Sequence, residues 1–195
     1  MAAGDSDTLT ANLALAMLSE DPIASVNPPD PNKRGRLCYQ FIDSSRRAML
    51  AAGQWRCAKR QFQASAAAAT LPFGGTAYPV PPDYIRMYEL HDHQERWEVM
   101  NLAGIGVCVV TRAGAPLNED YIFDLQDYTQ MDTLLVKAIA ADLATWMALP
   151  LSRDSALRSS CESERDNYLS LARTVSAQQA TPRQLDLGIL LRSRW

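Results

Sequence analysis

The stretch that decides the fold runs Asp127-Tyr-Thr-Gln-Met-Asp-Thr-Leu-Leu-Val-Lys-Ala-Ile-Ala-Ala-Asp-Leu-Ala-Thr-Trp-Met-Ala-Leu149. Its apolar residues recur at spacings of three and four, which is the period of one face of an α-helix. Because the apolar stripe is wide, we expect other helices to cover most of this helix. Pro150 is predicted to end it, since proline lacks the backbone N–H that continues the hydrogen-bond ladder.

Three further segments carry helical periodicity. A first short helix is predicted to begin with Asp7 or Thr8 as its cap and to end before Asp21-Pro22, and Gly53 is a plausible stop for the second. Prolines between Pro22 and Pro31 predict an extended linker between these two helices. A short corner after Pro150 makes the last two helices antiparallel neighbours. The second and fourth predicted helices span residues 33–52 and 153–176.

The segment between residues 55 and 123 has a different composition. Glycines and prolines separate short runs that are rich in β-branched and aromatic residues, which is typical of strands and turns. We expect a small antiparallel sheet, with Gly104-Ile105-Gly106 as a glycine-broken hairpin and His91-Asp92-His93-Gln94 as a hairpin tip. The predicted strands are residues 57–64, 84–90, 96–102, 105–111 and 121–123.

These patterns together predict an α+β fold, an antiparallel helical bundle of about four helices with a small antiparallel β insert and an extended C-terminal arm. The predicted helical bundle domain comprises residues 1–52 and 124–180, the β-rich insert domain residues 53–123, and the docking arm residues 181–195. The arm is strongly apolar, and such a segment requires a partner surface. Its candidate partner-binding residues are Leu185, Leu187, Ile189, Leu190, Leu191, Arg192, Arg194 and Trp195.

Composition excludes several classes of protein. The chain has 19 basic and 22 acidic residues among 195, and a net charge of −3 disfavours tight binding to a phosphate backbone. The four cysteines form no Cys-x-x-Cys pair, so we expect reduced, mostly buried thiols rather than a zinc site or a disulfide framework. No apolar run approaches a membrane span and no signal peptide is evident, which predicts synthesis in the cytoplasm and no membrane partner.

Patterns that carry enzyme chemistry are not found in the sequence. It contains no Gly-x-Ser-x-Gly elbow, no Walker loop and no His-Glu-x-x-His motif, so we expect a protein that is not an enzyme and has no cofactor. His91, His93 and Glu95 are candidate metal ligands, although a polar turn fits them better because the chain has no further histidine.

Charged and aromatic groups complete the set of candidates. The basic cluster Lys33-Arg34-Gly35-Arg36 is equally consistent with a partner contact and with a solvated face. Glu119-Asp120 and the acidic residues around Glu162, Glu164 and Asp166 are expected to be solvated. Trp55 and Trp146 are expected to anchor the core.

Four blocks of sequence, in this order, resemble a known family. They are Leu15-Ala-Met-Leu-Ser-Glu-Asp-Pro-Ile-Ala-Ser-Val26, Gly53-Gln-Trp-Arg-Cys-Ala58, Tyr78-Pro-Val-Pro-Pro-Asp-Tyr-Ile-Arg86 and the alanine-rich stretch 127–149. Their order and spacing resemble the phage head-to-tail adaptor (connector or neck) proteins, the family that includes tail tubular protein A. Departures include Ser19, where the family often has glycine, and Cys57, where an aromatic residue is usual.

The resemblance implies a structural role in a virion. Proteins of this family form a ring below the portal, commonly a dodecamer, that joins the capsid to a tail nozzle or tail-tube protein while genomic DNA passes through the lumen without specific binding. The C-terminal arm would then reach the portal protein. The alternative is a small metal-binding domain that uses His91, His93 and Glu95, or a DNA-binding domain led by Lys33, Arg34 and Arg36.

Overall fold

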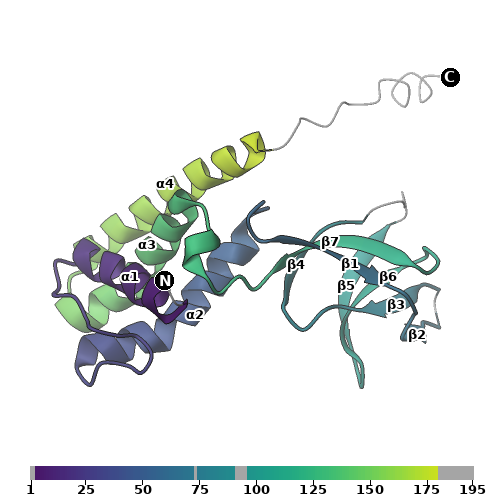
Figure 1. Ribbon diagram of the computed structural model, residues 1–195, viewed down its shortest axis with the longest axis horizontal. Helices are drawn as coiled ribbons and strands as arrows, with labels where there is room; N and C mark the ends of the chain where they lie inside the picture. The colour runs from purple at the N-terminus through teal and green to yellow at the C-terminus, as the bar shows by residue number, and fades with distance from the viewer. Residues whose placement is uncertain (1–2, 73, 91–95, 180–195) are drawn as a thin grey trace.

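The structure is a computed structural model that describes residues 3–72, 74–90 and 96–179. Figure 1 shows an elongated molecule with its helices at one end and its strands at the other. The described elements are α1 (Ala3–Met17), α2 (Lys33–Ala52), β1 (Lys59–Ala64), β2 (Ala69–Thr70), β3 (Thr76–Pro79), β4 (Tyr84–Leu90), β5 (Trp97–Leu102), β6 (Gly106–Thr111), β7 (Leu117–Phe123), the 3₁₀ turn η1 (Tyr128–Gln130), α3 (Thr133–Ser152) and α4 (Ser155–Gln178).

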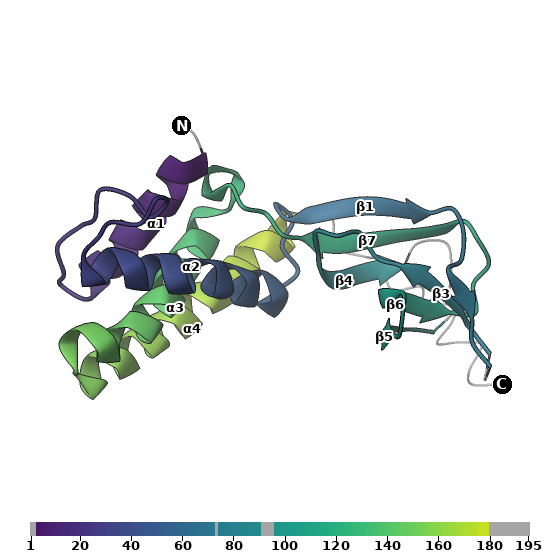
Figure 2. The same ribbon diagram turned by 90° about the horizontal axis from the view of Figure 1, so that it is seen from below.

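Helix α3 is the centre of the helical part. It contacts α1, α2 and α4, and all three lie around it in Figures 1 and 2. Small side chains let these neighbours approach its backbone closely, while buried Leu135, Leu143 and Met147 fill the space between the helices. The predicted wide apolar stripe is therefore confirmed. Its fully buried alanines are Ala138, Ala140, Ala141, Ala144 and Ala148.

The ends of α3 differ from the prediction. The helix begins at Thr133, because Asp127 instead caps the separate turn η1 by accepting a hydrogen bond from the Thr129 backbone N–H. Pro150 does not end it: α3 continues to Ser152 and stops at Arg153, which has a left-handed φ of 56°. A proline in the last turn removes a single ladder bond, and the Pro150 carbonyl accepts a hydrogen bond from Lys33 Nζ.

By length and composition α3 could cross a membrane, so the expectation that no segment approaches this length was wrong. In the structure 61% of that apolar window is buried inside the protein. A mostly buried apolar helix of this kind is what the core of a folded domain contains.

The strands form two antiparallel sheets. One has the strand order β1-β7-β4, and the other has the order β2-β3-β6-β5. The two sheets enclose a core of their own, made by buried side chains such as Tyr78, Val109 and Leu117. This is a separate cluster from the larger core around α3.

The predicted fold class was therefore wrong in one respect. The described residues hold four helices and seven strands in two sheets, an α+β fold rather than a helical bundle with a small β insert. Strands β2 and β3 escaped prediction because they are short and flank Gly74 and Gly75, which read as a loop. Most of β7 escaped because Asn118, Glu119 and Asp120 have low strand propensity. Pairing with β1 on one side and β4 on the other outweighs that propensity.

The linker between α1 and α2 is held against α1 rather than extended. Asn12 contacts both backbone groups of Ile23, accepting from its N–H at 2.8 Å and donating to its carbonyl at 3.1 Å. The Val26 N–H donates to Thr8 Oγ1 at 3.2 Å. Ile23 and Val26 are both buried, so the linker contributes to the core around α3.

Three sets of contacts join the helices to the segments that lead into β1 and out of β7. Trp55 is fully buried, as predicted, and its indole N–H donates to the Met49 carbonyl at 2.9 Å. The buried Arg46 donates to Asp124 Oδ1 at 3.2 Å. Near the end of α4, Ser176 Oγ accepts from the Arg56 N–H and donates to the Gln54 carbonyl. The core around α3 also includes Ile122 and its β7 neighbours, so the two parts share side chains at their junction.

We expect Gly35→Ala to lower the free energy of unfolding by about 1–3 kcal/mol. A Cβ at Gly35 would lie 2.5 Å from Asp30 Cβ and 2.5 Å from its carbonyl oxygen, so the linker must move away from α2. The matched control is Gly114→Ala, where nothing lies within 4 Å of the added Cβ. Urea denaturation checks both variants. The control is expected to stay within about 0.5 kcal/mol of wild type, and an equal loss in both would contradict the assigned contact.

Candidate interaction surfaces

The predicted docking arm, residues 181–195, lies outside the described residues, and so do all of its candidate partner-binding residues from Leu185 to Trp195. The candidate metal ligands His91, His93 and Glu95 also lie outside them. Within the described part of the chain, no group of three or more histidine, cysteine, aspartate or glutamate side chains is placed to hold a metal ion. The candidate surfaces must therefore be sought elsewhere.

The basic cluster at the start of α2 makes contacts within the chain. Arg34 forms ion pairs with Asp21 at 2.9 Å and with Glu20 at 3.3 Å, and Lys33 donates to the Pro150 carbonyl. Gly35 is required for the close approach of Asp30. Arg36 is exposed. Lys33 and Arg34, two of the three cations that a DNA-binding role would use, are therefore engaged in contacts within the chain.

The prediction that Glu119 and Asp120 are solvated was wrong. Asp120 is fully buried in β7 and forms an ion pair with Lys59 of β1. Glu119 is 1% exposed, and neither of its carboxyl oxygens has a hydrogen-bond partner among the residues that the structure describes. It stands opposite Phe62 and Leu90 on the neighbouring strands, and burial raises the pKa of its carboxyl to about 7. Acidic residues with low strand propensity gave no signal of this burial.

The acidic residues of α4 behave as predicted. Glu162 pairs with Arg158 one turn away at 3.0 Å, and Asp166 pairs with its neighbour Arg165 at 2.9 Å. Both carboxylates are at least partly exposed. They form a solvated face.

The cysteines are free thiols, as predicted. Cys38, Cys108 and Cys161 are buried, and Cys57 is partly buried. Burial raises the pKa of the Cys38 thiol to about 11, so it stays protonated at neutral pH. A protonated thiol in an apolar core is a poor nucleophile.

The prediction that Trp146 anchors the core was also wrong. Its side chain is 53% exposed and stacks on Phe41 of α2, with ring centroids 6.0 Å apart and planes at 17°. Leu149, one turn further along α3, is 40% exposed. Phe41, Trp146 and Leu149 form an apolar surface on the helical part, which we call the helix patch.

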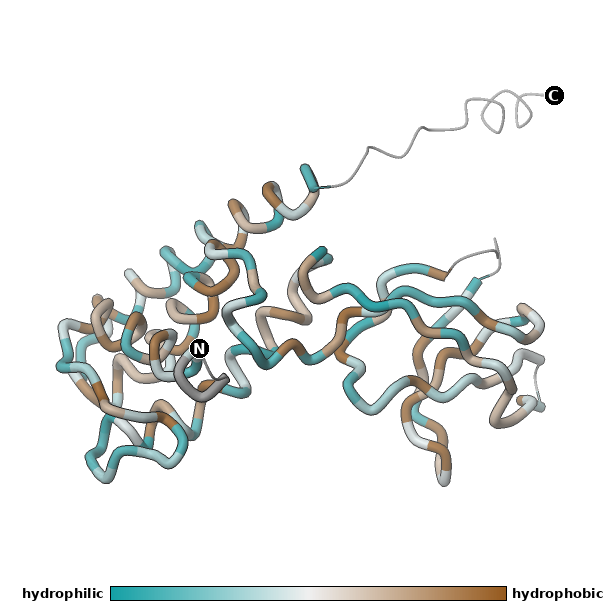
Figure 3. Tube along the Cα trace, viewed as in Figure 1, coloured by the Kyte–Doolittle hydropathy of each residue, from teal (hydrophilic) through white to brown (hydrophobic). Residues whose placement is uncertain are grey.

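A second apolar surface follows β5, one of the two outer strands of its sheet. All of its residues except the partly buried Leu102 are exposed, and Figure 3 shows hydrophobic residues along the β5–β6 hairpin that projects from the strands. Ile105 and Val107 also border an apolar hollow of about 270 Å³ next to Pro81. We call this surface the β5 edge, and its exposed apolar residues are Trp97, Val99, Met100, Ile105 and Val107.

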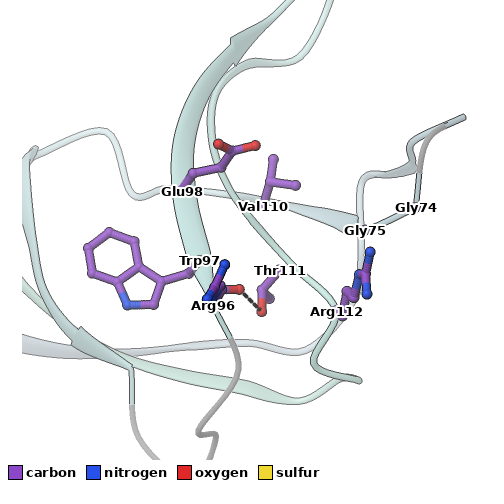
Figure 4. A pocket seen from close by; sticks show the side chains of 8 residues that line it. All are labelled: Gly74, Gly75, Arg96, Trp97, Glu98, Val110, Thr111 and Arg112. Atoms are coloured by element: carbon purple, nitrogen blue, oxygen red, sulfur yellow. Dashed lines mark hydrogen bonds between the residues drawn. The ribbon is translucent and has the colours of Figure 1, made fainter.

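A larger hollow of about 730 Å³ lies at the start of β5. Figure 4 shows Trp97 pointing to one side and Arg112 to the other, with the Thr111 hydroxyl donating to the Arg96 carbonyl at 3.1 Å between them. Glu98 lines the same hollow, so its charge is mixed rather than strongly cationic. Among the described residues that line it, the Thr111 hydroxyl donates to a backbone carbonyl rather than to a side-chain base.

Comparison with known proteins adds no assignment. No protein-family model matches the chain, and a search of curated proteins gives no significant match. The interpretation therefore depends on the surfaces described above and on the blocks of sequence that carry the resemblance.

The buried carboxyl of Glu119 makes stability depend on pH in a specific window. Because its pKa is raised from 4.5 to about 7, the folded state holds the proton more tightly than the unfolded state, and stability falls as the pH rises between these values. We expect Glu119→Gln to remove this part of the slope. At pH 8 the variant should exceed wild type in unfolding free energy by on the order of 1–3 kcal/mol.

Urea denaturation of wild type and variant between pH 4.5 and 8 measures this difference. The control is Glu162→Gln on the exposed face of α4, which should leave the pH dependence unchanged. A Glu119→Gln variant whose stability runs parallel to wild type over the whole range would contradict the burial of an ionising carboxyl.

Proposed function

We propose that this chain is a structural head-to-tail adaptor subunit of a tailed phage virion. In this role it forms a ring below the portal, joins the capsid to the tail, and lets DNA pass. The observation that carries the proposal is the pair of uncovered apolar surfaces, the helix patch and the β5 edge, on different parts of one molecule. Surfaces of different kinds that are covered by neighbouring copies generate a ring when the rotation between the copies closes.

The blocks of sequence that carry the family resemblance also support this role. Several of their residues stabilise the fold. Trp55 is buried at the junction of the two parts. The Tyr78 hydroxyl donates to the Ala113 carbonyl at 3.0 Å, and Asp83 accepts hydrogen bonds from Arg60 and Tyr121. Ser19, which stands where the family often has glycine, has a positive φ of 58° that glycine adopts readily.

The proposal assigns partners by chemistry. A homo-oligomeric ring, commonly a dodecamer in this family, is held by the two apolar surfaces, and the arm carrying Leu187, Leu190 and Trp195 docks on the portal protein. Each large apolar side chain buried there contributes about 1.5–3 kcal/mol before ordering costs. Repetition around the ring makes release slow. The tail nozzle or tail-tube protein is the partner on the other side, and the location is the head–tail interface of the virion after synthesis in the host cytoplasm.

Deletion of residues 183–195 is expected to weaken binding to the portal at least about tenfold while leaving the described fold intact. Co-sedimentation of the chain with assembled portal rings measures the binding, and circular dichroism with urea denaturation shows whether the variant still folds. The matched control is Leu171→Ser, which changes an exposed apolar residue of α4 outside the arm. Unchanged portal binding by the deletion variant would contradict the docking role of the arm.

A metal-dependent role predicts a different result. Replacing His91 and His93 together by alanine is expected to leave both oligomer size and portal binding unchanged, because the adaptor role uses no metal. Light scattering and co-sedimentation follow assembly, and elemental analysis of the purified protein follows bound metal. Loss of a stoichiometric metal together with loss of assembly would overturn the adaptor proposal and favour a metal site.

A further inference from the structure

The β5 edge is unusual among the outer strands of the two sheets. Natural proteins protect free strand edges with charges, short strands or bulges. Strand β1 carries Lys59 and Arg60, and β4 has register shifts against β7. Strand β2 has two residues. Among the outer strands that the structure describes, only β5 has none of these protections. It has six residues, its register with β6 is continuous, and its single charged residue is Glu98.

An unprotected, apolar edge of this length fits one more β-strand. The added strand would hydrogen-bond to the outer backbone groups of β5 and place alternate side chains on the two faces of the sheet. One face presents Trp97 and Val99, which are 40% and 41% exposed. Their β6 partners Thr111 and Val109 are buried on that face, so an added strand would continue an existing core outward.

The chain itself contains a segment with the required pattern outside the described residues. In Leu185-Asp-Leu-Gly-Ile-Leu-Leu191 the apolar residues Leu185, Leu187, Ile189 and Leu191 fall at every second position, which is the period of a strand, and a strand would place Leu190 on its other face. Seven residues span about 23 Å and the six residues of β5 span about 20 Å, so the lengths match. Asp186 is its single charged residue.

We propose that residues 185–191 of one copy add as a strand to the β5 edge of a neighbouring copy. In the register that places Ile189 opposite Val99, Leu187 and Leu191 lie on the face of Trp97 whichever direction the strand runs. This pairing deepens the proposed ring and rests on it. It moves the apolar residues of segment 185–191 from the portal contact to the contact between copies, which leaves Arg192, Arg194 and Trp195, after the strand, for the portal.

A second copy is a better source of the strand than the same chain. Ser176, in the last turn of α4, bonds to Gln54 and Arg56, just before β1. Figure 2 shows β1 and β5 on opposite sides of the strand part, so an arm that leaves α4 would have to cross the sheets to reach its own β5. A contact between an arm and a different surface is also heterologous, which is the kind that propagates around a ring.

Cysteine cross-linking tests the pairing directly. Chains carrying Val99→Cys are mixed with chains carrying Ile189→Cys and oxidised, and dimers are measured on a non-reducing gel. Directly opposite residues of adjacent strands are close enough for a disulfide. We expect at least about tenfold more cross-linked dimer than in the control mixture, where Gln63→Cys on the β1 edge replaces Val99→Cys.

The other outcomes overturn the proposal. They are no dimer above the control, dimers of Val99→Cys with itself, or a cross-link that forms only within one chain carrying both cysteines.

As a second measurement, Val99→Lys should reduce the oligomer fraction in light scattering. Because Val99 is 41% exposed, the lysine can stay solvated and the fold is kept. A specific cross-link in a protein that does not bind the portal would leave the strand pairing in place and remove the adaptor role. Rings that bind the portal but form no cross-link would contradict the strand pairing and leave the adaptor role in place.

Discussion

The close packing of α3 against α1, α2 and α4 is the constraint on which the rest of the structure depends. Its fully buried alanines bring the backbones together, and each buried large side chain such as Leu135, Ile139 or Leu143 contributes about 1.5–3 kcal/mol. The linker after α1 is part of the same core through Ile23 and Val26. Trp55 and Arg46 join this core to the segments that flank β1 and β7.

A consequence of this arrangement is a molecule with two ends of different character. The helices bury their core against one another, and the two sheets bury a second core between them. Trp146 and most residues of β5 lie outside both cores and are exposed. Exposed apolar side chains that cluster into a contiguous patch mark sites of protein–protein contact. The adaptor proposal gives each surface such a neighbour.

The periodicity of the sequence predicted the features that depend on residues close together in the chain. The predicted span of α2, from Lys33 to about Ala52, agrees with the structure, because Gly53 and the apolar spacing mark it clearly. The strand β7 was mostly missed, because Glu119 and Asp120 are buried only through partners that are distant in the sequence. Trp146 was placed in the core for a similar reason: a wide apolar stripe does not show which side lacks a covering helix. The sequence showed the apolar composition of β5. Its position at a free edge of the sheet follows only from the order of the strands in the structure.

The central claim is that copies of this chain assemble into a ring that docks on a portal. Electron microscopy of negatively stained particles, prepared by mixing the chain with its portal, tests this most directly. The account predicts closed rings of this protein stacked coaxially on the portal. Portal particles without an added ring, beside a chain that stays monomeric at the same concentration, would contradict it.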